Sequence, residues 1–177
     1  MSVTQDVTTI PTGTWSLDPT HSDIGFAVTY SSFGTFRGTF SEFGATLVDG
    51  KLEGRAKVAS VAIDDPNFAD HLQSPDFFDA ERNPELLFSS TSIEREGDAV
   101  TITGELTLRG ETKDVTIAGA VTGPGQDLYG NERIAFDVAT NVDRRDYGIN
   151  WNMDLPTGDP ALGNDVTITA NLALVRA

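Results

Sequence analysis

The chain has 177 residues, of which 12 are Lys or Arg and 27 are Asp or Glu, so its formal net charge is −15. Nucleic acids and anionic membrane surfaces attract clustered basic residues, and this acidic balance argues against both as partners. The absence of cysteine excludes disulfides, thiolate nucleophiles and cysteine-ligated metal sites. A chain of this length predicts a single domain with a sizeable core.

The N-terminal residues 1–13 are polar and rich in threonine, and they predict a disordered tail ahead of one domain over residues 14–177. They contain neither a basic segment nor an apolar run, so we expect no signal peptide and no stable membrane anchor. For a chain that has not been processed, the expected location is therefore the cytoplasm.

Alternation of apolar and polar residues predicts antiparallel strands along most of the chain. In residues 23–30, for example, Ile24, Phe26, Val28 and Tyr30 fall on one face. The other expected strands are 14–17, 35–44, 51–63, 86–94, 99–108, 115–122, 134–142 and 166–175, with longer loops at 123–131 and 152–163.

One segment, residues 64–90, interrupts this alternation. Asp65 followed by Pro66 is typical of a helix start, because a carboxylate caps free amides and proline lacks the N–H that would go unpaired. Ser74-Pro75 repeats the pattern, which predicts two short helices near residues 65–80. The apolar side chains of this insertion are expected to cover one end of a closed sheet; they are Phe68, Leu72, Phe77 and Phe78.

About eight antiparallel strands with little helix predict an all-β, eight-stranded closed barrel, because closure removes the unpaired edges of a sheet. Such a barrel is just wide enough to be filled by side chains or to hold one slender ligand. Small residues on the inner faces favour neither alternative, since they also fit the taper of a filled barrel. The side chains expected to face the lumen are Ile24, Phe26, Val28, Phe36, Phe40, Val58, Phe136 and Val138.

Several segments together resemble the YceI-like family of lipocalin-like, polyisoprenoid-binding proteins. They are 15–22 (WSLDPTHS), 26–28 (FAV), 71–79 (HLQSPDFFD), 83–84 (NP), 87–90 (LFSS), 104–115 (GELTLRGETKDV), 141–151 (NVDRRDYGINW) and 163–166 (GNDV). The segments follow the family's order and span nearly the whole chain. Tyr30 is a departure, because the family often has histidine there, and a ligand whose polar end meets this position would differ accordingly.

The resemblance implies an eight-stranded barrel with a long apolar lumen that accepts an isoprenoid tail. It implies non-enzymatic binding, carriage or storage of a lipid such as an isoprenoid quinone or a polyprenyl phosphate. No cofactor or metal is expected beyond that lipid. The sequence does not decide between a monomer and a homodimer. The predicted ligand-binding residues are Ile24, Phe26, Val28, Tyr30, Phe36, Phe40, Val58, Phe77, Phe78, Phe136, Val138, Arg144 and Trp151.

Two features of the sequence could carry chemistry instead. His21 and His71 are the only histidines, and paired with a carboxylate either could serve a small β-barrel enzyme that acts on a hydrophobic substrate. No third ligand stands at a metal-binding spacing, so hydrogen bonds that fix turns are favoured for both. Arg144, in the densest charge cluster, could bind a diphosphate or a quinone carbonyl, or belong to an ion-paired turn, and the sequence favours neither.

Overall fold

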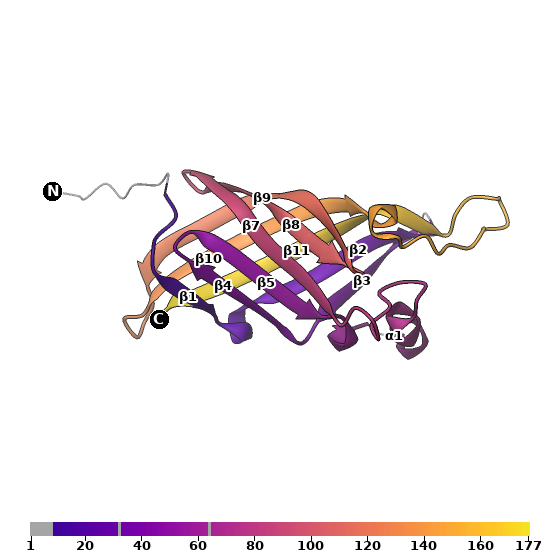
Figure 1. The fold of residues 1–177 in the computed structure, drawn as a ribbon, viewed down its shortest axis with the longest axis horizontal. Coiled ribbons are helices and arrows are strands. Elements are labelled where there is room, and N and C mark those ends of the chain that lie inside the picture. The colour runs from indigo at the N-terminus through magenta and orange to yellow at the C-terminus, as the bar shows by residue number, and fades with distance from the viewer. Residues whose placement is uncertain (1–8, 32, 64) are drawn as a thin grey trace.

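The structure is a computed structural model that describes residues 9–31, 33–63 and 65–177, so most of the predicted tail over 1–13 lies outside the described residues (Figure 1). The described strands are β1 Thr14–Leu17, β2 Asp23–Tyr30, β3 Gly34–Phe40, β4 Phe43–Val48, β5 Lys51–Lys57, β6 Val61–Ala62, β7 Glu85–Glu96, β8 Ala99–Leu108, β9 Glu111–Gln126, β10 Glu132–Asp143 and β11 Leu162–Arg176. The helical elements are α1 Pro66–Gln73 and three 3-10 turns, η1 Pro19–His21, η2 Val58–Ser60 and η3 Arg144–Tyr147. None of the described helices is long and apolar enough to span a bilayer.

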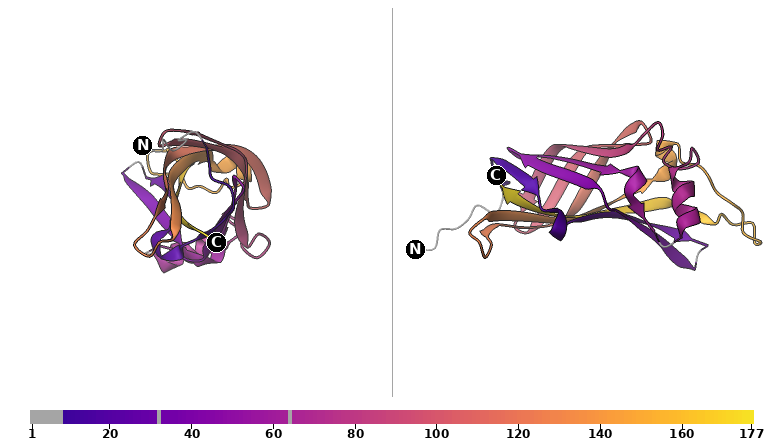
Figure 2. Two further views of the ribbon diagram at one scale, coloured as in Figure 1. Left: turned by 90° about the vertical axis from the view of Figure 1, so that its left-hand side faces the viewer. Right: turned by 90° about the horizontal axis from the view of Figure 1, so that it is seen from below.

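The sheet closes through β11, which pairs with β10 along one edge and with both β1 and β2 along the other. The first six strands fill only three positions in the ring. At each of these positions two successive strands follow one another, separated by a break: β1 and β2, β3 and β4, and β5 and β6. The described strands thus make an eight-position antiparallel ring, seen end-on in Figure 2. This confirms the predicted lipocalin-like barrel with a short helical insertion.

Two long strands expected from the sequence are broken. The predicted strand 35–44 splits into β3 and β4, and the predicted strand 51–63 splits at η2. Ser60 makes the second break tolerable, because its Oγ donates to the carbonyl of Lys57 at 2.7 Å and accepts from the N–H of Glu42 at 3.0 Å. A side chain thereby replaces ladder hydrogen bonds that the bend removes.

Of the two short helices predicted for the insertion, the first is present and the second is not. Helix α1 begins where expected, since the Asp65 carboxylate accepts from the N–H groups of Asn67 and Phe68. The second expected helix is wrong: residues 74–79 form hydrogen-bonded turns, in which the N–H groups of Phe77 and Asp79 both donate to the carbonyl of Ser74. Asp79 has a φ of 51°, in the left-handed region, which is incompatible with continuing a helix.

One end of the barrel is filled with side chains. The residues there come from strand segments that meet near both termini, and all of them are almost fully buried. They are Trp15, Leu47, Val121, Ile134, Phe136 and Leu174. Interlocked packing of this kind leaves no room for a ligand, so a binding site inside the barrel has to lie toward the other end, where α1 lies (Figures 1 and 2).

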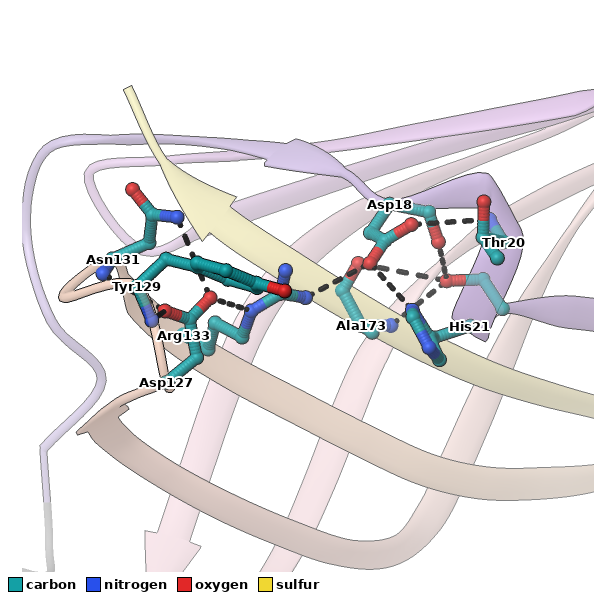
Figure 3. A network of polar contacts seen from close by, with 9 residues as sticks. Asp18, Thr20, His21, Asp127, Tyr129, Asn131, Arg133 and Ala173 are labelled. Carbon is teal, nitrogen blue, oxygen red and sulfur yellow. Dashed lines mark hydrogen bonds and ion pairs between the residues drawn. The ribbon is translucent and has the colours of Figure 1, made fainter.

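Arg133 connects the segment between β1 and β2 to the turn between β9 and β10 at the filled end (Figure 3). Its Nη1 donates to Asp18 Oδ2 at 2.9 Å, and its Nε donates to Asp127 Oδ2 at 2.6 Å in the turn between β9 and β10. Asp18 also pairs with Nδ1 of His21 at 2.7 Å. The hydrogen bonds to Arg133 are the main reason why the pKa values of the Asp18 and Asp127 carboxyls are lowered from 3.8 to about 2.

This network predicts a specific acid sensitivity. Because both carboxyls have a folded-state pKa below the unfolded value, the stability they contribute is fully present above pH 3.8 and is lost as the pH falls toward 2. Arg133→Met should therefore lower the thermal midpoint at pH 6 and flatten its fall between pH 4 and 2. Arg82→Met, at an exposed arginine, is the control. Equal slopes for the two variants would contradict a role for Arg133.

Candidate functional site

An apolar cavity lies between the sheet and the insertion that contains α1. Its volume is about 70 Å³. The cavity wall is wholly apolar. Its lining comes from the strands (Phe26, Val28, Phe36, Phe40, Leu86, Leu108, Val142, Leu162, Val166 and Ile168), from the insertion (Phe68, Leu72, Phe77 and Phe78) and from the segment around η3 (Arg144 and Ile149).

Aromatic rings join the insertion to the barrel wall. Phe26 on β2 lies with its ring centroid 5.8 Å from Phe40 and 6.3 Å from Phe78 of the insertion. Phe36 on β3 packs against Phe68 of α1 with the centroids 4.5 Å apart. Rings at these separations attract one another beyond their loss of water contact. The insertion is therefore held over the cavity by the same side chains that line it.

Gly38 makes room for this cluster. A Cβ atom at this position would lie 2.7 Å from Cζ of Phe26, closer than carbon atoms approach in proteins. The absence of a side chain at Gly38 leaves space for the Phe26 ring, which contacts Phe78. Alternation places residue 38 on the inward face, but only the three-dimensional packing shows that the space above it is already occupied.

Two loops hold the outer side of the insertion. The His71 ring lies edge-on to Trp151 and to Phe77, with centroids 4.8 Å and 4.9 Å away. In the turn after β8, Nη2 of Arg109 donates to the carbonyl of Pro75 at 2.7 Å. The insertion therefore rests on contacts from both sides, although its only described helix has eight residues.

Both histidines pair with carboxylates, but neither pair borders the cavity. Nε2 of His71 lies 3.0 Å from Oδ2 of Asp76, where both side chains are partly exposed. His21 and Asp18 lie near the filled end, within the network around Arg133. A His–carboxylate pair that acts on a substrate in the cavity would have to line it, and these two pairs do not.

Arg144 is buried, with 3% of its surface exposed, and its guanidinium binds main-chain carbonyls. Nε donates to Gly163 at 2.8 Å, while Nη1 donates to Trp151 at 2.7 Å and to Ile149 at 3.1 Å. Burial lowers the pKa of this guanidinium. Because the cavity wall is apolar, the part of Arg144 that borders it is the methylene stem.

The ion-paired turn considered from the sequence is made by the neighbouring residue. Nη2 of Arg145 lies 2.6 Å from Oδ2 of Asp143, on the exposed side of η3. Adjacent arginines thus have different partners, one a carboxylate and the other three carbonyls. Nothing in the alternation or in the local charge pattern distinguishes them, because the carbonyls become neighbours only after η3 folds back toward β11.

The structure brings some of the predicted ligand-binding residues to the cavity and not others. Those that line it are Phe26, Val28, Phe36, Phe40, Phe77, Phe78 and Arg144. Those buried elsewhere in the core are Ile24, Val58, Phe136 and Val138. Tyr30 is 49% exposed at the end of β2, and Trp151 packs on the outer side of the insertion, so neither lines the cavity.

Residues absent from the predicted set complete the lining. Leu86, Leu108 and Val142 belong to predicted strands. Leu108 and Val142 alternate with polar neighbours, which was a usable signal, whereas Leu86 is followed by Leu87. Ile149 and Leu162 fall in or beside an expected loop, where periodicity says nothing. Their position depends on the turn that Arg144 holds together.

Comparison with known proteins places this geometry in context. A family model described as the YceI-like domain matches residues 15–174. Protein YceI of Escherichia coli O157:H7 is 31% identical over 140 residues, covering 75% of this chain and 73% of that protein. Protein YceI of Salmonella newport (strain SL254) is 32% identical over the same length and the same shares of both chains.

Two solved structures share the fold. The crystal structure of Burkholderia cenocepacia BcnA matches with a TM-score of 0.73 at 21% identity, covering 89% of this chain and 98% of that one. The structure of a polyisoprenoid binding domain from Saccharophagus degradans, implicated in plant cell wall breakdown, matches with a TM-score of 0.68 at 13% identity. That match covers 92% of this chain and 98% of the domain.

Arg144→Met tests whether the buried guanidinium is structural. The variant keeps an apolar stem beside the cavity but removes the donors to three carbonyls, and hydrogen bonds to charged groups are each worth roughly 1.5–3 kcal/mol. We expect the free energy of unfolding in urea to fall by about 3 kcal/mol. Arg145→Met, which removes an exposed ion pair, should cost much less, and equal losses would contradict the assignment.

Proposed function

Because this chain belongs to the family of YceI-like domain proteins, we propose that it binds a hydrophobic lipid of the polyisoprenoid type in the cavity beneath the insertion. The observation that carries the proposal is a wholly apolar cavity at the one end of the barrel that side chains leave open. The shared fold with a polyisoprenoid binding domain supports the choice of lipid. An isoprenoid quinone and a polyprenyl phosphate both present such a chain.

The enclosed space is too small for a prenyl chain while the insertion is in place. An apolar cavity of about 150 Å³ holds one benzene molecule, which is similar in size to a single isoprene unit. The cavity here encloses about 70 Å³. Loading therefore requires the insertion to move away from β2 and β3.

The apolar wall selects the chain of the lipid and not its head group. Burial of apolar surface supplies roughly 25 cal/mol per Å² before ordering costs are subtracted, and it requires no placed charge. The guanidinium of Arg144, which could have met a diphosphate, is occupied by carbonyls. A head group bound to this chain would lie outside the cavity, near its mouth.

The role we propose is non-enzymatic binding, carriage or storage. Acid–base catalysis on a bound lipid requires a titratable group within reach of the reacting atoms. Neither described His–carboxylate pair lines the cavity, because Phe77 lies between the His71 ring and the cavity and the His21 pair is near the filled end. This arrangement supports a binding role over the alternative of a small β-barrel enzyme.

Mass spectrometry of an organic extract of the purified protein tests the proposal, with a cavity-filling variant as comparison. Val166→Phe fills part of the cavity with a larger side chain from β11, so we expect the variant to lose the extracted polyisoprenoid. Val175→Phe makes the same change in the same strand away from the cavity, and it should retain the lipid. Equal lipid content in both folded variants would contradict binding at this site.

Truncation of the aromatic side chains of the insertion should speed ligand exchange. Phe78→Ala removes the contacts to Phe26 and Phe40, so the insertion should open more easily and a bound fluorescent polyprenol should dissociate faster. Amide hydrogens over residues 66–79 should also exchange faster than those of β8. A dissociation rate unchanged by both Phe77→Ala and Phe78→Ala would place the opening elsewhere, for example at the loop over residues 150–161.

A further inference from the structure

Exposed apolar side chains lie on two neighbouring tips at the cavity end of the barrel. Phe33 is 96% exposed, Met153 is 61% exposed and Tyr30 is 49% exposed. We call these three residues the mouth rim. They come from two tips, the hairpin between β2 and β3 and the loop over residues 150–161, which extend past the barrel at the end where α1 lies (Figures 1 and 2).

The two tips of the mouth rim are joined by hydrogen bonds. The N–H of Ser31 donates to the carbonyl of Ala161 at 2.6 Å, and the N–H of Ala161 donates to the carbonyl of Met153 at 2.7 Å. Asn152 adds a side-chain tie, since its Nδ2 donates to the carbonyl of Leu162 and its Oδ1 accepts from the N–H of Leu162. The backbone segments that carry the exposed side chains are therefore held next to each other.

The mouth rim is continuous with the cavity. Tyr30 pairs directly with Leu162 across β2 and β11, and Leu162 lines the cavity. Val28, two residues before Tyr30 on the same face of β2, lines it as well. An apolar ligand that leaves the cavity on this side would pass from the lining to the mouth rim without crossing a polar surface of β2.

We propose that the mouth rim docks transiently onto a neutral or zwitterionic lipid bilayer while the cavity is loaded or emptied. This inference rests on the proposed function, because a polyisoprenoid resides in bilayers for the same reason that it fits an apolar cavity. Contact at the rim lets the chain move between the two without exposure to water. Phe33 and Met153 leave water in that contact, which favours docking.

Charge near the rim determines which bilayer fits. Asp154 and Asp159 are exposed on the same loop as Met153, and the whole chain has a net charge of −15. Anionic lipids would be repelled by this surface, in contrast to the attraction that basic segments feel. The bilayer that matches the mouth rim is therefore one without net charge at its surface.

The opposite end of the barrel supplies a matched control. Leu128 and Tyr129 are 97% and 87% exposed in the turn between β9 and β10, next to the filled end. Their side chains are as exposed as those of the mouth rim, but they are far along the barrel from the cavity (Figure 1). Nonspecific hydrophobic association with vesicles would be weakened equally by substitutions at either end.

The test compares Phe33→Gln/Met153→Gln with Leu128→Gln/Tyr129→Gln and the unchanged protein. A fluorescent polyprenol is first titrated in dilute detergent solution, which measures binding without a bilayer. Its transfer to phosphatidylcholine vesicles is then timed at increasing vesicle concentration. We expect equal affinity for all three proteins in solution. The unchanged protein and the control variant should transfer at a rate proportional to vesicle concentration, while the rim variant transfers about tenfold more slowly because its apolar contact is lost.

Four other outcomes would overturn the proposal. Equal transfer rates for the rim and control variants, with binding in solution intact, would reject the docking proposal and leave the proposed function standing. Faster transfer to vesicles that contain phosphatidylglycerol would reject the neutral bilayer as the partner. A dimer of the unchanged protein in sedimentation that the rim variant disrupts would assign the rim to a second copy of the chain. Failure of the unchanged protein to bind the polyprenol in solution would instead reject the proposed function, and the docking proposal with it.

Discussion

The pairing of β11 along both of its edges is the constraint on which the rest of the structure depends. It closes the sheet, so the barrel has two ends and no free edge on β11. Near the termini the interior is packed around Trp15 and Leu174. At the other end, strand side chains such as Phe26, Phe36 and Phe40 meet side chains of the insertion. The insertion between β6 and β7 covers this end, and the cavity lies where these two parts meet.

The aromatic cluster gives the cavity its character. Phe26, Phe36 and Phe40 belong to the wall, while Phe68 and Phe78 belong to the insertion, and their rings interlock. The same contacts that exclude water must therefore separate when a chain enters. A site closed in this way binds by shape and apolar burial. The polar residues beside it stabilise the surrounding fold. Arg144 shows this, because its charge organises three carbonyls around the mouth.

Several elements follow directly from the sequence because their signals are local. The alternation in β2 and β8 gave both strands their observed bounds, and Asp65 with Pro66 marked the start of α1. The resemblance carried by segments spread over residues 15–166 identified the family, which the comparisons confirm. Periodicity also separated inward from outward positions, so Phe26 and Phe40 were expected on the face where they are found.

Other features depend on contacts between residues far apart in the chain. The breaks at residues 41–42 and at η2 follow from closure of the barrel, which no local pattern records. Ile24 and Phe136 share the inward register of Phe26, yet of these three only Phe26 lines the cavity, where Gly38 leaves space for its ring and Phe78 packs against it. Sequence alone determined which faces are apolar, because side-chain alternation is a property of each strand. The tertiary structure decided where the interior stays open, because that depends on which side chains meet across the barrel.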